Sequence, residues 1–360
     1  MAINVFSSLF NPSNTLLGID ISTSSVKVLQ LETVGKGYQV SAYAVMPLSK
    51  GVVAAGVIEK LPSVVDALER ALARCGVSAK QAALAMPTQA VTTRNLVFPA
   101  DYSEQSIYEQ IEADAHLHIP FPLEEVRFDF STVGPNKNPA DVDVLLAASR
   151  REQVDGRINA VEAVGLTPIV VDIESYCVQR SIAQTARLMP KAGKGLILAH
   201  LDIGANTSTL TVVQDHAILF QREQPFGGQQ LTLDIAKHYG LSAEDAEIKK
   251  RLADLPADYA QSVLKPFLQD AAQVAARSLQ FFYTSTPYGR VDQLLLAGGS
   301  AILPGILDAV TQKTQVPVVL FNPVQGYAIH SRVNRRQLEL DAPALSVVTG
   351  LAMRAFDPKG

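Results

Sequence analysis

The pattern of apolar and polar residues near the start of the chain predicts a β-hairpin with an unusual turn. Residues 16–21 (LLGIDI) are almost all apolar, as in a buried strand, and residues 26–32 (VKVLQLE) resume a strand pattern. A second turn at residues 35–37 and a strand at residues 38–45 follow. Asp20 precedes the first turn, which consists of four hydroxyl-bearing residues: Ser22, Thr23, Ser24 and Ser25. Such residues favour turns for local hydrogen-bonding reasons, so this hairpin alone indicates no function.

The same order of elements occurs again from residue 196. An apolar strand runs into Asp202, a turn rich in small and hydroxyl-bearing residues follows, and two more strands come after it. The turn begins with Gly204, Ala205, Asn206 and Thr207. Asp20 and Asp202 therefore hold equivalent positions in two hairpins. Two unrelated hairpins are the simpler alternative, but the repeat favours duplicated halves that face one cleft.

Periodic apolar residues predict helices between these strands. In residues 57–75 the apolar side chains recur on one helical face. Further helices are expected at residues 103–118, 150–164, 172–188 and 259–284. Strands that alternate with helices are typical of the α/β class.

A third turn adds a candidate ligand-binding loop. It comprises Gly298, Gly299 and Ser300, after a buried strand that starts at residue 291 and before a helix that we expect to open near Leu303 and Pro304. A strand–glycine–helix unit exposes backbone amides and lets a ligand approach closely. Neither a G-x-G-x-x-G nor a P-loop motif occurs, which argues against the two commonest nucleotide-binding folds.

The composition of the chain narrows the classes of protein and the compartments that fit the sequence. The 360 residues, 48% of them hydrophobic, suffice for about two domains. A net charge of −4 without a block of like charge argues against a nucleic-acid partner. Two cysteines without zinc-site spacing, and no apolar run long enough to span a membrane, fit a protein in the cytoplasm. Residues 1–14 lack the features of a signal peptide, and we expect them to pack on the rest of the chain.

Several segments together resemble a known family. The two hydroxyl turns and the segment LAGGSAILPG resemble the two phosphate motifs and the adenosine motif of the actin-like ATPases. Three further segments resemble the type IV pilus assembly protein PilM family, whose members are relatives of the division protein FtsA: EADAHLHIPFPLEEVRFDF, DVLLAASRREQV and EAVGLTPIVVDIESYCVQRSI. The resemblance runs from about residue 14 to residue 356. The end of the sequence, GLAMRAFDPKG, does not resemble the amphipathic tail of FtsA, which favours PilM.

The resemblance implies a fold and a domain organisation. The fold is an α/β, actin-like (ribonuclease H-like) duplicated two-lobe fold, with a central nucleotide cleft and an FtsA-type inserted subdomain. The first-lobe core is expected at residues 14–84 and 166–197, with the inserted subdomain at residues 85–165. The second-lobe core is expected at residues 198–226 and 290–356, with a helical subdomain at residues 227–289.

It also implies bound ATP and Mg²⁺. Asp20 and Asp202 would face the metal through water, and Lys27 the β- or γ-phosphate. Amide and hydroxyl donors to the phosphates would come from Ser22, Thr23, Ser24, Ser25, Gly204, Ala205, Asn206 and Thr207. The adenosine side would comprise Gly227, Gly228, Glu247, Lys250, Gly298, Gly299 and Ser300. The alternatives are a solvated strand lysine at Lys27, a plain turn at Gly227 and a surface ion pair between Glu247 and Lys250.

Hydrolysis is less clearly indicated than binding. Glu174 matches the place where relatives orient the attacking water, and a carboxylate there can act as a general base. An acid favoured by the dipole at a helix N-terminus explains the same residue. Ala205 stands where some relatives carry an acid. We therefore expect slow turnover, with ATP acting mainly as a conformational ligand.

By resemblance, the chain is an ATP-binding scaffold of the inner-membrane complex that assembles type IV pili and supports twitching motility. Its expected partners are the N-terminal cytoplasmic tail of PilN, the motor ATPases PilB and PilT, and a second copy of itself. PilN would keep it peripheral to the inner membrane. A small-molecule kinase of the sugar-kinase superfamily and an FtsA-like filament-forming division protein are the alternatives.

The inserted segment is the expected partner site. A strand within residues 89–99 (QAVTTRNLVFP) and a helix that carries Ile107, Ile111 and Leu117 would offer a groove for an extended peptide. The alternative is that this segment only packs on the core.

Overall fold

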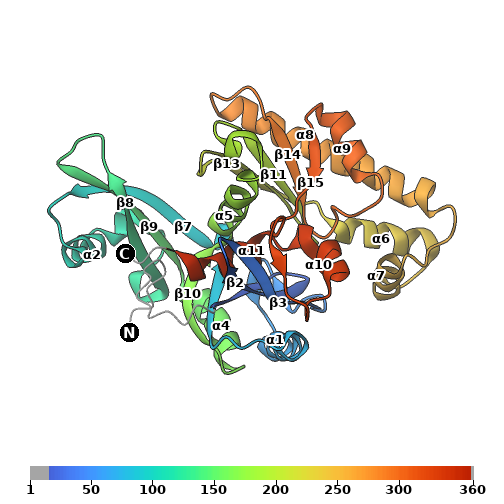
Figure 1. Cartoon of the computed structure of the whole chain (residues 1–360), viewed down its shortest axis with the longest axis horizontal. Coiled ribbons are helices and arrows are strands. Elements are labelled where there is room, and N and C mark those ends of the chain that lie inside the picture. The colour runs from blue at the N-terminus through green and yellow to red at the C-terminus, as the bar shows by residue number, and fades with distance from the viewer. Residues whose placement is uncertain (1–15, 358–360) are drawn as a thin grey trace. The chain divides into compact units, whose positions relative to one another are not determined.

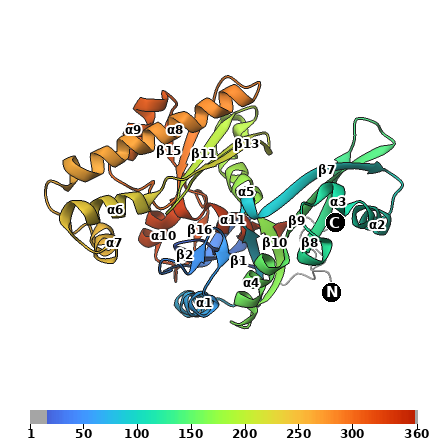
Figure 2. The same cartoon turned by 180° about the vertical axis from the view of Figure 1, so that it is seen from behind.

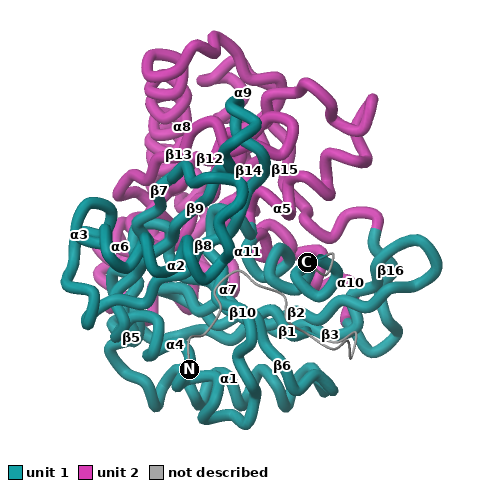
Figure 3. Tube along the Cα trace, turned by 90° about the vertical axis from the view of Figure 1, so that its left-hand side faces the viewer, with its two compact units in different colours: residues 1–177, 327–333, 347–360 teal, residues 178–326, 334–346 magenta. Residues whose placement is uncertain are grey.

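The computed structural model describes residues 16–357, so the predicted packing segment at residues 1–14 lies outside the described residues (Figure 1). The chain forms two compact units, shown in different colours in Figure 3. Unit 1 contains the residues up to 177, residues 327–333 and the residues from 347 onward. Unit 2 contains residues 178–326 and 334–346.

Unit 1 is built on a six-stranded sheet with the strand order β10-β6-β1-β2-β3-β16. β1 pairs with β2, and β2 with β3, in antiparallel fashion, whereas β1, β6 and β10 run parallel. The short β16 adds in parallel to β3. The strands are β1 (Leu16–Ile21), β2 (Ser25–Val34), β3 (Gly37–Pro47), β6 (Gln81–Met86), β10 (Thr167–Ile173) and β16 (Ala328–Ile329).

Unit 2 repeats this topology. Its sheet has the order β13-β12-β11-β14-β15, with two antiparallel pairs followed by two parallel pairs. The strands are β11 (Leu198–Ile203), β12 (Ser208–Gln214), β13 (Ala217–Gln224), β14 (Gln293–Ala297) and β15 (Val318–Leu320). Strand for strand, β11 corresponds to β1 and β12 to β2, which confirms the duplication predicted from the two hydroxyl turns.

Helices cover both faces of the unit 1 sheet (Figure 2). α1 (Leu61–Cys75) and α4 (Arg151–Glu162) bury their apolar faces against the side chains of β1 and β2 that point to the same side. α5 (Glu174–Ala186) begins on the opposite face, where α11 (Ser346–Ala352) also packs. A Cβ on Gly18 of β1 would lie 2.6 Å from the backbone oxygen of Val348, so only glycine permits this approach of α11.

This packing corrects the predicted domain boundaries. Residues 347–356 were assigned to the second lobe, but they pack with unit 1. The guanidinium of Arg354 lies 3.3 Å from the buried carboxylate of Asp172, and a Cβ on Gly350 would overlap the backbone of Cys177. The division between the units also falls inside α5, after Cys177, rather than at residue 197. Neither boundary has a local sequence signal, because long-range contacts decide both.

The inserted subdomain of unit 1 is a three-stranded antiparallel sheet with the order β7-β9-β8. Two helices, α2 (Glu104–Ala113) and α3 (Ala115–His118), pack against it. Its strands are β7 (Val91–Pro99), β8 (Val126–Pro135) and β9 (Asp141–Arg150). α4 was predicted within the insertion, but its residues Val154, Ile158 and Val161 are buried in the core of the main sheet.

In unit 2, α8 (Lys265–Ser285) and α9 (Ile306–Thr314) pack on the sheet. A second cluster of buried residues joins α6 (Gly228–Tyr239), α7 (Ala243–Leu252) and the π-helical turn Ala260–Leu264 to the start of α8. The remaining elements are β4 (Val53–Ala54), β5 (Val57–Ile58), α10 (Arg335–Asp341) and 3₁₀ turns at Thr88–Ala90, Leu123–Glu125, Pro190–Gly193, Ala342–Ala344 and Met353–Phe356.

Several predicted helix boundaries were wrong. The helix expected at residues 57–75 begins at Leu61, because Val57 and Ile58 pair as β5. The helix expected at residues 103–118 is interrupted at Asp114. The helix after the glycine loop begins at Ile306, because Gly305 before it has a φ of +82°.

Candidate functional site

The Asp20 turn in unit 1 is a compact structure with internal hydrogen bonds. The backbone N–H of Ser22 donates to the carbonyl of Ser25 at 3.0 Å, and its hydroxyl donates to the same carbonyl at 2.9 Å. The carbonyl of Ser24 accepts a bond from the N–H of Leu48 at 2.9 Å. Among the hydrogen bonds of the described residues, none uses the N–H of Thr23 or Ser24. The tip of the turn therefore carries donors suited to an anion.

Asp20 and Lys27 form a buried ion pair beside this turn. They are cross-strand neighbours in the β1–β2 ladder, and the ammonium lies 2.7 Å from Asp20 Oδ2. The same ammonium donates to the Ser22 hydroxyl at 3.2 Å. Asp20 is 4% and Lys27 8% exposed, so the solvated strand lysine considered from the sequence is excluded.

The Asp202 turn in unit 2 is bound to the glycine pair that opens α6. The N–H of Gly228 donates to the carbonyl of Gly204 at 2.9 Å, and that of Gln229 to Ala205 at 2.8 Å. A Cβ on Gly227 would lie 2.5 Å from the Ala205 carbonyl oxygen, which is closer than the Cβ atoms of proteins approach other atoms. Gly227 is thus required for the close approach of two backbones, not only for a turn.

The third glycine loop meets the same two segments. The N–H of Ser300 donates to the carbonyl of Ile203 at 3.2 Å, beside Asp202. A Cβ on Gly298, whose φ is +89°, would lie 2.5 Å from Asp202 Oδ1, and a Cβ on Gly228 would lie 2.7 Å from the Ser300 hydroxyl. Three loops that the sequence placed far apart therefore converge within unit 2.

Glu247 and Lys250 lie beside this convergence. The Lys250 ammonium is 2.6 Å from Glu247 Oε2, and it also donates to the Thr232 hydroxyl at 2.6 Å and to the Gly228 carbonyl at 3.2 Å. Burial opposes ionisation of Glu247, but hydrogen bonds from Lys250 and Thr232 outweigh it and lower its pKa to about 2. The pair is fixed against the glycine backbone, unlike the surface ion pair considered as an alternative.

The part of the candidate site in unit 1 also includes Glu174 and Arg157, a residue that the sequence did not suggest. Glu174 is the first residue of α5, directly after β10. Arg157 on α4 is fully buried, and the carboxylates of Glu174 and Asp20 contribute to its electrostatic environment. Its signal in the sequence was weak, since an arginine in an amphipathic helix is usually exposed.

Within residues 16–357, no group of three or more histidine, cysteine, aspartate or glutamate side chains could hold a metal ion. A metal bound by one carboxylate and several waters, as Mg²⁺ commonly is, would not form such a group. Asp20 belongs to unit 1 and Asp202 to unit 2.

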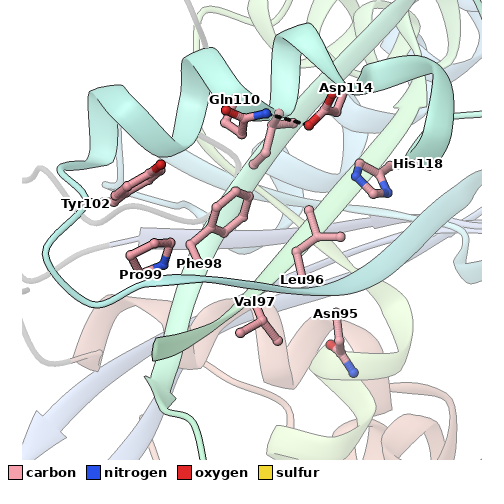
Figure 4. A pocket seen from close by; sticks show the side chains of 10 residues that line it. Asn95, Leu96, Val97, Phe98, Pro99, Tyr102, Gln110, Asp114 and His118 are labelled. Carbon is pink, nitrogen blue, oxygen red and sulfur yellow. Dashed lines mark hydrogen bonds between the residues drawn. The ribbon is translucent and has the colours of Figure 1, made fainter. Parts of the chain in front are cut away.

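The inserted subdomain carries a pocket of about 470 Å³ between β7 and the α2–α3 segment (Figure 4). β7 is an edge strand of its sheet. The lining is apolar at Leu96, Val97 and Phe98 of β7, and polar at Gln110 on α2, Asp114 between the helices and His118 on α3. An edge strand beside a helix with an apolar floor is suited to an extended peptide that adds to the sheet.

The expected groove residues only partly line this pocket. Ile107 and Ile111 both belong to the core of the subdomain, and of the two only Ile111 lines the pocket. Leu117 is among the most exposed apolar side chains of the described chain and is not part of the lining. The helix is interrupted at Asp114, so Ile107 and Ile111 lie on α2 and Leu117 lies on the separate α3, not on one continuous helix.

The duplicated sheets, each with a hydroxyl turn after its first strand, define the actin-like ATPase fold. A solved structure of the ethanolamine utilization protein EutJ from Carboxydothermus hydrogenoformans shows this fold, with 17% identity over 96% of this chain and 92% of that chain and a TM-score of 0.54. The chain belongs to the family of the type IV pilus assembly protein PilM, whose model matches residues 18–356.

Two further comparisons agree with this family. A solved structure of a PilM–PilN type IV pilus biogenesis complex is 25% identical, covers 95% of this chain and 99% of that chain, and has a TM-score of 0.77. The cell division protein FtsA of Bacillus subtilis (strain 168) is 24% identical over 209 residues, which are 51% of this chain. That match spans 45% of the length of FtsA, so the chain covers less than half of this relative.

Proposed function

We propose that this chain is an ATP-binding scaffold of the type IV pilus assembly complex, bound to an extended tail of a PilN-like membrane partner. Membership of the PilM family supports the pilus role, and the similar solved structure is of a PilM–PilN complex. No helix among residues 16–357 is long and apolar enough to cross a membrane. On the basis of family membership, we propose that the chain lies on the cytoplasmic side of the inner membrane and is held there by its partner.

The convergence of the three glycine-containing loops in unit 2 carries the nucleotide part of the proposal. Gly227, Gly228 and Gly298 permit the close packing of these loops, which brings the Ser300 hydroxyl and the Lys250 ammonium beside the Asp202 turn. This is the donor set that phosphate and ribose oxygens require. The Asp20 turn of unit 1 offers a second set of donors, with Lys27 beside it.

The residues fit Mg·ATP. Mg²⁺ keeps several waters and needs one or two carboxylates together with phosphate oxygens. Asp20 in unit 1 and Asp202 in unit 2 are each a candidate for such a carboxylate. Lys27 is paired with Asp20, and a phosphate would compete for its ammonium. When bound, Mg²⁺ neutralises part of the phosphate charge, while the chain's own hydroxyl and amide groups orient the phosphates.

Isothermal titration calorimetry of the purified chain with Mg·ATP tests the site. We expect saturable binding that is lost in Asp202→Asn, with an unchanged far-UV circular dichroism spectrum. Asp308→Asn, at an exposed position on α9, is the matched control and should bind as the original chain does. Equal affinity of Asp202→Asn and the original chain would contradict the site.

We propose that ATP acts as a conformational ligand, with hydrolysis slower than the roughly 1 s⁻¹ lower end of typical enzymes. Glu174 would be the residue that orients the attacking water, and it lies in the field of buried Arg157. Release of phosphate from Mg·ATP at steady state measures this rate. A rate well above 1 s⁻¹ that disappears in Glu174→Gln would instead indicate an enzyme.

The pocket at β7 and α2 is the proposed site for the partner's tail. A peptide strand added to the free edge of β7 would gain main-chain hydrogen bonds, with its apolar side chains over Leu96 and Phe98. We also propose that the complex contacts the motor ATPases PilB and PilT, and that two copies can associate, on the basis of family membership alone.

Fluorescence anisotropy with a labelled peptide of the PilN tail tests the pocket. Val97→Asp on β7 changes a pocket residue that is 54% exposed, so the fold should tolerate it, and we expect it to abolish binding. Val133→Asp, at an exposed position on β8 of the same sheet, is the matched control and should bind normally. Binding that survives Val97→Asp would move the tail to another surface.

A further inference from the structure

A buried hydroxyl on α6 contacts both charged residues of α7 at the candidate site. Thr232 is 1% exposed and lies one helical turn after Gly228, the first residue of α6. Its oxygen accepts a hydrogen bond from the Lys250 ammonium at 2.6 Å, and its proton is donated to Glu247 Oε2 at 2.6 Å. A threonine inside a helix usually bonds to the carbonyl four residues earlier, which here is that of Gly228 at 3.2 Å. The two charged partners come from another helix, so Thr232 joins α6 to α7.

The ammonium of Lys250 is held by groups of the chain itself. An ammonium has three N–H donors, and three acceptors lie within hydrogen-bonding distance of this one: Glu247 Oε2, the Thr232 hydroxyl and the Gly228 carbonyl. The side chain of Lys250 is only 17% exposed. A lysine held by a single partner keeps much of its rotamer freedom, which is then lost when a ligand binds. The three acceptors restrict the ammonium before any ligand arrives.

Glu247 and Lys250 alone would form an ordinary helical ion pair. They lie three residues apart on α7, and such pairs on the surface of a helix contribute little to stability. The second oxygen of Glu247 accepts from Arg251 of the same helix at 2.8 Å. Of these contacts, only those with Thr232 and Gly228 reach α6. The threonine hydroxyl thus extends a local ion pair into a connection between two helices.

Further hydrogen bonds lead from the start of α6 to the turn after β11. Lys250 donates to the carbonyl of Gly228, and the N–H of Gly228 donates to the carbonyl of Gly204 at 2.9 Å. The N–H of Gln229 donates to the carbonyl of Ala205 at 2.8 Å. All of these residues belong to unit 2. A displacement of the Lys250 ammonium would therefore disturb the backbone to which this turn is bound.

We propose that Thr232 is a positioning residue of the nucleotide site. Its hydroxyl holds the Lys250 ammonium against the Gly228 carbonyl, so that unit 2 presents a fixed positive charge and a fixed Asp202 turn to the nucleotide. This inference rests on the proposed function, because it requires a nucleotide beside these loops. Groups that are already in place lose less conformational freedom on binding, so Thr232 tightens the complex without touching the ligand.

Calorimetric titration with Mg·ATP measures the effect of the hydroxyl. Thr232→Val removes the hydroxyl and keeps a branched side chain, and we expect about ten-fold weaker binding because two hydrogen bonds to charged groups are lost. Thr232→Ser keeps the hydroxyl and should stay within about three-fold of the original chain. Thr311→Val on α9, which loses only a hydrogen bond to the Leu307 carbonyl, is the matched control and should bind as the original chain does.

A double-mutant cycle shows whether Thr232 acts through Lys250. In the Lys250→Met background the ammonium is absent, so Thr232→Val should change the affinity for Mg·ATP by less than about two-fold. The same four chains give a second readout without nucleotide, from their melting temperatures. Thr232→Val should lower the melting temperature less in the Lys250→Met background than in the original chain, because the hydroxyl and the ammonium are partners before the nucleotide binds.

The outcomes separate the inference from the proposed function. An affinity of Thr232→Val within about two-fold of the original chain, together with a lower melting temperature, would show that the hydroxyl only stabilises unit 2; the inference would be overturned and the proposed function left intact. An equal loss of affinity with and without the Lys250 ammonium would overturn the action through Lys250. Absence of Mg·ATP binding in the original chain would overturn the proposed function, and this inference with it.

Discussion

Removal of the Lys27 ammonium should destabilise unit 1 more than removal of both members of its ion pair. In Lys27→Met, the Asp20 carboxylate would stay 4% exposed without the partner that now lies 2.7 Å away. Breaking a buried pair on one side costs about 3–5 kcal/mol, whereas removing both charges is often close to neutral. We therefore expect Lys27→Met to lose about 3–5 kcal/mol, and Lys27→Met/Asp20→Asn to recover most of this loss.

The expected loss of stability in Lys27→Met is large enough to measure in a chain with two compact units. For a unit of about 200 residues, each kcal/mol shifts the melting temperature by about 2–4 °C, so the single variant should melt about 10 °C lower. The chain contains no tryptophan, so thermal and urea unfolding should be followed by far-UV circular dichroism. Lys36→Met, in the exposed turn between β2 and β3, is the matched control and should stay within about 0.5 kcal/mol.

Two results would refute this reasoning. A loss below about 1 kcal/mol in Lys27→Met would show that Asp20 finds another partner or water, so that the pair is not an isolated buried one. A double variant as unstable as the single variant would show that packing of the lysine stem, rather than the unpaired charge, causes the loss. The cycle formed by the two single variants and the double variant gives the coupling energy directly.

Two further predictions concern unit 2. Gly227→Ala should cost about 2–4 kcal/mol of stability and abolish Mg·ATP binding, because its Cβ would meet the Ala205 backbone. Gly228→Ala should cost less than about 1 kcal/mol, because the Ser300 hydroxyl can rotate away. Urea unfolding and calorimetry compare the two variants, and equal losses would contradict the argument from the backbone contact. Burial lowers the pKa of His200 to about 3, so the unfolded chain binds the extra proton below pH 6.5, and about 2 kcal/mol of stability should be lost between pH 7 and pH 5. His200→Gln should remove this part of the pH dependence, and an unchanged pH profile in the variant would show that other groups cause it.

The order of the main elements was predictable because it depends on local pattern. The run of buried residues in β1, the hydroxyl turn and the alternation of β2 are properties of neighbouring residues, and they occur twice. The cap of α7 was equally local, since the Ser242 hydroxyl accepts from the N–H of Asp245 at 3.0 Å. Patterns of this kind can be recognised without knowing what each segment packs against.

The candidate site was predictable in part. The residues of the three glycine-containing loops and the Glu247–Lys250 pair were named from the sequence, and unit 2 brings them together. The ion pair between Lys27 and Asp20 was not foreseen, because Lys27 had been assigned to a phosphate of the nucleotide. Arg157 was missed altogether, since its helix pattern gives no indication that the charged residue is the buried one.

The amino-acid sequence by itself determined the duplicated strand–turn–strand plan, the α/β class and the loops that carry donors, because each depends on residues within one or two turns of chain. Only the tertiary structure decided which unit holds residues 347–356, that α4 belongs to the main core, and that Arg157 is buried in the field of Glu174 and Asp20. These features depend on contacts between segments separated by many residues, such as Arg157 with Ala85 and Arg354 with Asp172. Burial of charge is a property of the assembled core, and no local pattern encodes it.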